Sequence, residues 1–232
     1  MEISRINHGW VMRSHAHVAE VEFTAAIANI AANGGGSVRW FVCEPNADEQ
    51  RFATQHGLVA DVPLLHMQCE LPLAEQHRVP LGFVTRPFRP GIDDDEWLAV
   101  NARAFASHPE QGEWTHAVLN ERLAESWFDA AGFLLHEIDG RIAGYCFTKV
   151  HRTNPPVGEI YVIGVDPAHH GKGLGRALTV AGFAHLSASG LRHGMLYVAG
   201  DNLAAIGLYE SLGMRVAHRD EVFVGTVSAN RP

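Results

Sequence analysis

The residues best suited to chemistry lie at 158–176, where an apolar stretch runs into a glycine-rich turn. Glycines stand at positions 171, 173 and 175, and the pattern that follows predicts a helix from Leu174 to about Ser189. Glycine lacks the Cβ atom that would hold a ligand off the backbone, and the first N–H groups of a helix have no partner within it. The turn is therefore typical of an anion site, and a diphosphate would fit it best.

The residues around this turn distinguish it from other glycine-rich segments. Glycine spacing alone could mark a flexible connection. A phosphate loop of the NTPase type needs Ser or Thr after Gly-Lys, whereas Gly173 follows Lys172. A dinucleotide fold needs G-x-G-x-x-G and an acidic residue after the next strand, whereas this chain has G-x-G-x-G and continues with the helix to about Ser189 and then the strand 195–199.

The turn resembles the acyl-CoA site of the GNAT acetyltransferases. That family carries Arg or Gln-x-x-Gly-x-Gly or Ala after a strand that ends Val-x-Pro. Here Val165-Asp-Pro precedes His170-x-x-Gly173-x-Gly175, so His170 replaces the usual Arg or Gln.

A second block resembles the same family. It runs from Tyr197 through Asn202 and Ala205 to Tyr209 and Gly213, like the GNAT strand, Asn-x-x-Ala and Tyr-x-x-x-Gly motifs. From the residues alone, Asn202 could be a helix N-cap and Tyr209 a packed aromatic side chain, and both can hold together with a binding role.

Composition is that of an ordinary enzyme. The 232 residues are 47% hydrophobic with a net charge of −8, and the apolar runs are too short to span a membrane. Without a basic cluster, no nucleic-acid partner is expected. Three separate cysteines and scattered histidines lack metal-ligand spacing, so no metal is expected. We expect a cytoplasmic monomer or homodimer that acts on a small-molecule amine.

The elements expected at 81–227 follow the GNAT order, which predicts an α/β protein with a mixed (α+β) sheet and one complete GNAT domain. A proline-rich linker at 73–90 leads into it, and 228–232 is a tail. The expected elements are a strand at 81–86, helices starting near 93 and 115, a hairpin of 133–138 and 142–150 turned at Asp139-Gly140, the strand before the glycine turn, a helix at 174–189, a strand at 195–199, a helix at 203–212 and a strand at 214–226.

The first part, 1–72, resembles a truncated and degenerate copy of the latter half of this unit. Strands are expected at 6–12, 37–43 and 62–69, with helices at 16–32 and 47–56. Residues 38–46 and 52–58 echo 195–202 and 209–214. The turn at 12–18 has no glycine, so this part is predicted to bind no CoA. An unrelated α/β appendage is the alternative.

A degenerate GNAT half before a full one is the plan of the mycothiol synthase family, which the chain resembles from Asn101 to about Phe223. The resemblance implies acetylation, by acetyl-CoA, of the cysteinyl amine of a cysteine–glucosamine–inositol conjugate. It implies substrate contacts from Glu110, Lys149, Glu159 and Tyr197. The implied acetyl-CoA contacts are Ile163, Gly164, Val165, His170, Gly171, Lys172, Gly173, Leu174, Gly175, Arg176, Asn202, Ala204, Ala205 and Gly207.

Three groups are expected to carry catalysis. Glu159 is the candidate base, and it would act through water because four residues of strand place it about 13 Å from Ile163. The Ile163 N–H, freed where the strand splays at Gly164, would donate to the acetyl oxygen. Tyr209 would protonate the CoA thiolate. Direct transfer is predicted, because Cys146 would otherwise have to be the nucleophile.

Several of these residues have simpler interpretations. Glu110 could be a solvated loop acid and Lys149 an ordinary strand-end lysine, or Lys149 could pair structurally with Glu159. For the whole chain, the alternatives are a GNAT enzyme for another amine, such as an amino sugar, polyamine or peptide N-terminus, and a non-catalytic CoA-binding protein.

Overall fold

The computed structural model describes residues 1–6, 9–14, 16–106 and 109–230, without the side chains at 6, 109 and 110. The chain divides into two compact units that interleave in sequence. One holds Met1–Met67, Val198–Ile206 and Val216–Pro232, and the other holds Gln68–Tyr197 and Gly207–Arg215. We call them the first unit and the second unit.

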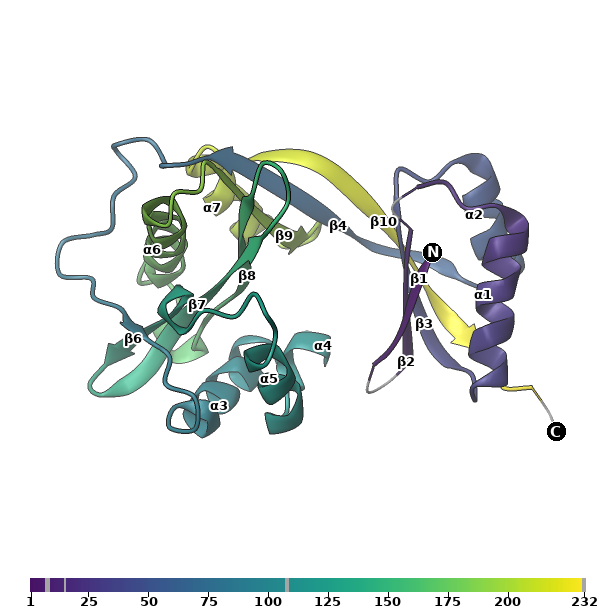
Figure 1. Ribbon diagram of the computed structural model, residues 1–232, viewed down its shortest axis with the longest axis horizontal. Helices are drawn as coiled ribbons and strands as arrows, with labels where there is room; N and C mark the ends of the chain where they lie inside the picture. Colours follow the sequence, from purple (N-terminus) through teal and green to yellow (C-terminus); the bar gives the residue numbers. More distant parts are fainter. Residues whose placement is uncertain (7–8, 15, 107–108, 231–232) are drawn as a thin grey trace. The chain divides into compact units, whose positions relative to one another are not determined.

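In the first unit, two helices lie on one face of a mixed sheet (Figure 1). The strand order is β1-β2-β3-β10-β4, with β2 and β3 parallel and the pairs β1–β2 and β3–β10 antiparallel. The elements are β1 (Glu2–Ile6), β2 (Gly9–Ser14), α1 (Glu20–Ala32), β3 (Gly36–Cys43), α2 (Ala47–Gln55), β4 (Val59–Glu70) and β10 (Arg215–Val227).

Alternation along β3 separates the two faces of this sheet. Trp40 and Val42 belong to the core under the helices, where the Trp40 ring lies 4.5 Å from that of Phe23. Trp40 Nε1 donates to Ser14 Oγ at 2.8 Å, which satisfies its buried polar group. Phe41 points to the opposite face, where it joins a smaller apolar cluster.

In the second unit, α6 lies on one face of the sheet and α3 and α5 on the other (Figure 1). The strand order is β9-β8-β7-β6-β5, with β8 and β9 parallel and the other neighbours antiparallel. The elements are β5 (Arg86–Pro87), α3 (Asp94–Ala104), α4 (Pro109–Gly112), α5 (His116–Leu123), η1 (Ala130–Gly132), β6 (Phe133–Ile138), β7 (Arg141–His151), β8 (Val157–Val165), η2 (Pro167–His169), α6 (Leu174–Ala188), β9 (His193–Ala199) and α7 (Leu203–Ser211), with β9 and α7 also contributing to the first unit.

Most of the expected elements are confirmed, including the 133–150 hairpin. Its turn residues Asp139 and Gly140 have φ of 52° and 73°, as a type I′ turn requires. The strand expected at 81–86 is wrong, because only Arg86–Pro87 pairs with β6, and Leu81 is fully exposed. The strand expected at 6–12 is two strands, β1 and β2.

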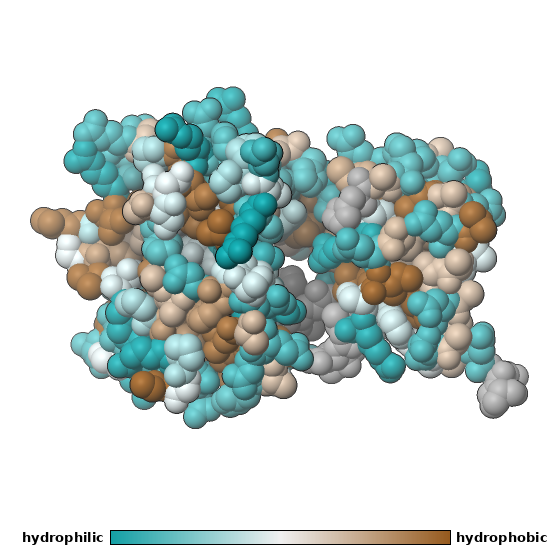
Figure 2. Space-filling view, in the orientation of Figure 1, coloured by the Kyte–Doolittle hydropathy of each residue, from teal (hydrophilic) through white to brown (hydrophobic). Residues whose placement is uncertain are grey.

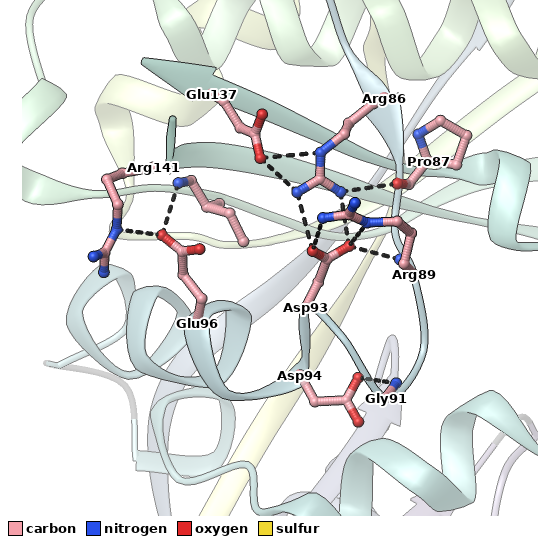
Figure 3. A network of polar contacts seen from close by, with 10 residues as sticks. Arg86, Pro87, Arg89, Gly91, Asp93, Asp94, Glu96, Glu137 and Arg141 are labelled. Atoms are coloured by element: carbon pink, nitrogen blue, oxygen red, sulfur yellow. Dashed lines mark hydrogen bonds and ion pairs between the residues drawn. The ribbon is translucent and has the colours of Figure 1, made fainter. Parts of the chain in front are cut away.

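A network of charged side chains fixes the start of α3 (Figure 3). The buried Asp93 carboxylate accepts hydrogen bonds from Arg86 and Arg89, and Arg86 also reaches Glu137 of β6. Burial by itself would raise the pKa of Asp93, but the bonds from Arg89 and Arg86 lower it below its usual range. The network therefore ties α3 to the edge of the sheet.

Hydrophilic residues cover much of the face shown in Figure 2, with hydrophobic residues in small groups. Exposed large hydrophobic side chains occur in both units, such as Val21 and Leu81. Among the described residues, no helix combines the length and apolar character needed to cross a membrane.

Candidate active site

A β-bulge divides β8 into two stretches. Thr148 of β7 pairs with Ile160, and the next residue back, Phe147, pairs with Val162. Tyr161 is therefore an extra residue without its own cross-strand partner. Such a bulge bends a strand and re-aims the side chains beside it.

The opening beside β8 begins where its pairing with β9 ends. Within the described chain, that pairing covers Gly158–Ile160. The Asp166 N–H donates to the Ala143 carbonyl of β7 at 2.9 Å. Because N–H groups alternate in direction along an antiparallel strand, the Ile163 N–H points away from β7 toward the open side. The strands part after Ile160, which corrects the splay predicted at Gly164.

The glycine turn has a backbone that favours glycine at two of its three positions. Gly171 and Gly173 have φ of 74° and 76°, in the left-handed region. At both, no described atom lies within 4 Å of the place a Cβ would take. Gly175 lies within α6, where its would-be Cβ meets only Leu208 at 3.9 Å. The turn thus exposes its backbone at Gly171 and Gly173.

The N-terminus of α6 offers free donors just after this turn. The first helical bond runs from the Ala177 N–H to the Gly173 carbonyl at 3.1 Å. The N–H groups of Leu174, Gly175 and Arg176 precede it, so the helix supplies no acceptor for them. The first turn of α6 carries no acidic residue. This end of a 15-residue helix is suited to bind an anion.

Two side chains in the turn have partners of their own. His170 Nε2 donates to the Val165 carbonyl at 3.0 Å, which fastens the turn to the end of β8. Lys172 Nζ lies 3.3 Å from His169 Nδ1, and both side chains stay at the surface. The His170 side chain thus stabilises the conformation of the turn.

The Arg176 side chain faces α7 and the linker. Its guanidinium donates to Ser211 Oγ at 2.7 Å and lies 2.9 Å from His77 Nδ1. Its backbone N–H therefore remains the group that can face a ligand at the turn.

A carboxylate lies buried on β8, six residues before the strand ends at Val165. Glu159 is only 6% exposed, and its Oε2 accepts a hydrogen bond from His151 Nε2 at 2.7 Å. A carboxylate costs free energy when buried unless it is paired. His151 is that partner, and its side chain is 31% exposed, so the pair reaches solvent.

Lys149 does not pair with Glu159, although the two are cross-strand neighbours. Its Nζ lies over the rings of Trp127 and Tyr161, at 4.8 and 5.2 Å from their centres. A cation over aromatic faces is stabilised by the ring quadrupole. The structural ion pair considered from the sequence is therefore wrong, and Lys149 belongs to an aromatic cluster beside Glu159.

Tyr209 and Cys146 are both buried in the second unit. Burial raises the pKa of Tyr209 to about 12, and its hydroxyl makes no hydrogen bond among the described residues. Burial also raises the pKa of the Cys146 thiol, which packs against Gly182 of α6. Tyr209 is therefore held protonated, and Cys146 is a poor nucleophile.

A model of the acetyltransferase (GNAT) family matches residues 97–214. A curated mycothiol acetyltransferase from Acidothermus cellulolyticus is 43% identical over 222 residues, which cover 89% of this chain and 68% of the relative. One from Salinispora arenicola is 57% identical over 143 residues, 60% of this chain and 46% of the relative. The chain belongs to the mycothiol synthase-like GNAT acetyltransferases.

A solved GNAT structure agrees on the fold. The GCN5-related N-acetyltransferase from Sphaerobacter thermophilus superposes with a TM-score of 0.68 at 24% identity, covering 86% of this chain and 62% of that one. The chain spans from about half to about two thirds of the length of the curated relatives named above. By family it is an acetyl-CoA-dependent N-acetyltransferase.

The other expected GNAT contacts are distributed over the two units. Asn202 Oδ1 accepts from the Ala205 N–H at 3.1 Å at the start of α7, as an N-cap does. Asn202, Ala204 and Ala205 belong to the first unit, whereas Gly207 and Tyr197 belong to the second.

Of two further residues expected to contact the substrate, the structure describes the side chain of Tyr197 but not that of Glu110. Tyr197 is 43% exposed on β9. Glu110 lies in α4, and its side chain is outside the described residues.

The sequence interpretation missed His151 and the bulge at Tyr161. His151 stands two residues after Lys149 on β7, so alternation puts it on the same face as Lys149, next to Glu159. This alternation is visible in the sequence and could have predicted the position of His151. The bulge has no comparable local pattern, because it depends on the register of β7 against β8.

Proposed function

We propose that this chain transfers the acetyl group of acetyl-CoA directly to the cysteinyl amine of the cysteinyl-glucosaminyl-inositol precursor of mycothiol. The names of the similar curated proteins support the acceptor. The observation that carries the proposal is β8 itself. One strand bears a buried carboxylate, an N–H turned to an open side and, at its end, the glycine turn into α6.

The diphosphate of CoA is assigned to the backbone at the start of α6. The free N–H groups of Leu174, Gly175 and Arg176 and the open backbone at Gly171 and Gly173 fit an anion of this kind. Acetyl-CoA supplies the activated acyl group. The role of His170 is indirect, because its ring is bound to the Val165 carbonyl.

Glu159 acts as the base for the substrate ammonium. An amine attacks a thioester only when neutral, and the Glu159 carboxylate takes its proton through a water molecule. His151 Nε2 holds Oε2 of this carboxylate, which leaves Oε1 for the water. Because His151 reaches solvent, it also offers the proton a way out.

The Ile163 N–H stabilises the oxygen that becomes negative when the amine attacks. Removing a single donor of this kind in other enzymes slows turnover by about 10²–10³-fold. The bulge at Tyr161 gives this N–H its direction, since the open side begins there.

Tyr209 protonates the CoA thiolate as it leaves. A phenol with a pKa of about 12 keeps its proton at neutral pH and can donate it to a departing thiolate. The amine attacks the acetyl carbonyl, the C–S bond breaks and the proton from Tyr209 goes to sulfur. No acetyl-enzyme is formed, since the Cys146 thiol is buried and protonated.

The acceptor lies beside Lys149 and the rings of Trp127 and Tyr161. These groups share a face of the sheet with Glu159 and offer an ammonium donor framed by apolar rings. Such a surface suits a polyhydroxylated acceptor whose amine approaches Glu159. Glu110 and Tyr197 are further substrate contacts in this proposal.

The decisive experiment incubates the purified chain with acetyl-CoA and a panel of amines and follows release of the CoA thiol. The panel contains the cysteinyl-glucosaminyl-inositol conjugate, glucosamine, a polyamine and a peptide with a free N-terminus. We expect turnover with the conjugate at least tenfold above the other amines. Preferred turnover of another amine would contradict the proposed acceptor. Binding of acetyl-CoA without turnover of any amine would contradict the proposed catalytic activity.

A further inference from the structure

Three potential metal ligands meet on the first unit's sheet, on the face that α1 and α2 do not cover. Cys43 ends β3, and its Cα partner on β10 is Asp220. His218 lies two residues before Asp220 and so points to the same face. One ligand atom of each side chain, Sγ, an imidazole nitrogen and a carboxylate oxygen, lies within 4.8 Å of the other two.

We propose that Cys43, His218 and Asp220 bind one zinc-class divalent cation, with a fourth position open to water. Thiolate, imidazole and carboxylate are the ligands that Zn²⁺ takes in proteins. Around a tetrahedral Zn²⁺ with bonds of about 2.0–2.3 Å, ligand atoms lie about 3.5 Å apart, so side-chain rotations that close the gap by about 1 Å complete the site.

His66 of β4 gives the site an outer partner. Its Nδ1 lies 3.0 Å from His218 Nδ1, and its side chain is buried. With Nδ1 engaged in this way, His218 presents Nε2, the nitrogen that lies 3.9 Å from Asp220 Oδ1. Metal-bound histidines usually use their second nitrogen for such a hydrogen bond, which fixes the ring and its tautomer.

Negative charge surrounds Cys43. The carboxylates of Asp220 and Glu44 both interact electrostatically with its side chain. A divalent ion bound there would offset this negative charge and neutralise the neighbouring carboxylate.

The site would also join distant parts of the chain. Residue 43 and residues 218–220 are separated by the entire second unit in sequence, which explains why cysteine and histidine spacing gave no metal signal. A cation bound between β3 and β10 acts as a cross-link within the first unit and does not depend on the proposed acetyl transfer.

For the test, a chelator first removes any metal from the full chain. The chain is then titrated with Zn²⁺, followed by calorimetry, and separately with Co²⁺, followed by absorption spectroscopy. We expect one ion per chain and, with Co²⁺, the charge-transfer absorption that a thiolate ligand produces. Cys43→Ser should abolish that band, and Asp220→Asn should weaken Zn²⁺ binding by about 100-fold or more. His66→Gln should weaken it by about 10-fold, as expected for an outer partner.

Cys69→Ser is the matched control, because the half-buried Cys69 belongs to the second unit and is not one of the three ligands. It should bind both ions like the parent chain. Zn²⁺ should also raise the thermal midpoint of the parent but not of Cys43→Ser.

The parent chain's Co²⁺ spectrum decides the question even if a variant fails to fold. Absence of one-to-one Zn²⁺ binding, a Co²⁺ spectrum without a thiolate band, or a folded Cys43→Ser that binds like the parent would each overturn the proposal.

Discussion

The two long helices that follow a strand, α1 and α6, begin in different ways. At α6 the N-terminal N–H groups face an open, glycine-lined turn with no acid in the first turn. At α1 the N-cap is Ala19, and Glu20 and Glu22 occupy the first turn. Glu22 in turn binds the N-terminal ammonium of Met1 at 2.6 Å. The positive end of α1 is therefore already matched by the protein's own carboxylates.

The segment before α1 is held by an internal anion that α2 supplies. The fully buried Glu49 of α2 accepts hydrogen bonds from the Val18 and Asn46 N–H groups, both at 2.9 Å. His17 Nδ1 lies 3.1 Å from the same carboxylate. The first unit satisfies this loop with a side chain, whereas the start of α6 in the second unit has backbone donors for which the helix supplies no acceptor. This contrast supports the prediction that the first part binds no CoA.

A second contrast lies in the helices α2 and α7. Phe52 stands where Tyr209 stands in the parallel between the two parts of the sequence, and each is buried. Phe52 packs beside Phe23 with ring centres 5.8 Å apart. The first unit keeps the packing function of this position without the hydroxyl that could donate a proton.

The largest effect is expected from Glu159→Gln. If catalysis belongs to β8 and its turn, this change should lower kcat by about 10³-fold, since it removes the general base. Gln can still accept from His151, so the unfolding midpoint and the Kd for acetyl-CoA should change little. Steady-state kinetics, denaturation and calorimetry measure these three quantities.

Glu210→Gln, on the exposed side of α7, is the control and should match the parent. A Glu159→Gln enzyme with near-parental kcat would show that another group deprotonates the amine.

Tyr209→Phe gives the second unit the side chain found in the first. We expect kcat to fall about 10²-fold, because the thiolate then leaves without its acid. In the parent, the pKa of about 12 means that Tyr209 loses its proton only as pH rises through that value. The pH–rate profile should therefore show no alkaline fall from this group below about pH 11.

Phe52→Tyr is the reciprocal change and should not raise activity. Unaltered turnover in Tyr209→Phe would leave Tyr209 as a packing residue only.

Glu49→Gln tests the internal anion of the first unit. Losing a charged acceptor of two backbone N–H groups should cost about 2 kcal/mol in the free energy of unfolding. Urea denaturation measures this loss, and Asp48→Asn, an exposed change in the same helix turn, should cost far less. The Kd for acetyl-CoA should stay at the parental value, and a large rise in it would contradict the separation of the two turns.

Gly173→Ala is expected to give the smallest effect. A side chain in the left-handed region costs about 1–2 kcal/mol, so the Kd for acetyl-CoA measured by calorimetry should rise about tenfold if the turn must keep this conformation to bind. Gly57→Ala in the first unit is matched to it, with φ of 72° and no neighbouring atom within 4 Å. It should lose similar stability and leave the Kd unchanged. If Gly173→Ala and Gly57→Ala had the same Kd for acetyl-CoA, the proposal that the glycine turn binds acetyl-CoA would be contradicted.

Local pattern predicted the second unit well, because its elements follow from hydrophobic period and turn chemistry. Asp139-Gly140 specifies a tight hairpin, and the glycine turn marks the start of α6 within a residue. Leu81 misled the prediction, since an apolar residue in a proline-rich segment looks like a strand although it lies exposed.

Contacts between distant residues could not be predicted in this way. The helix expected from residue 16 begins at Glu20, because His17 and Val18 are held by Glu49, 31 or more residues away. The bulge at Tyr161 depends on how two strands align, and the meeting of Cys43 with His218 depends on β10 returning to β3.

That return of β10 sets an order of assembly during synthesis. The strand runs beside β3 from Asp220 to Val227, so the first unit lacks an inner strand until the ribosome has made every strand of the second. The earliest residues of the chain thus wait longest for a complete sheet, with the edge of β3 unpaired in the meantime. Released chains truncated before residue 216 should therefore contain a folded second unit and a first unit open to proteolysis and to chaperones.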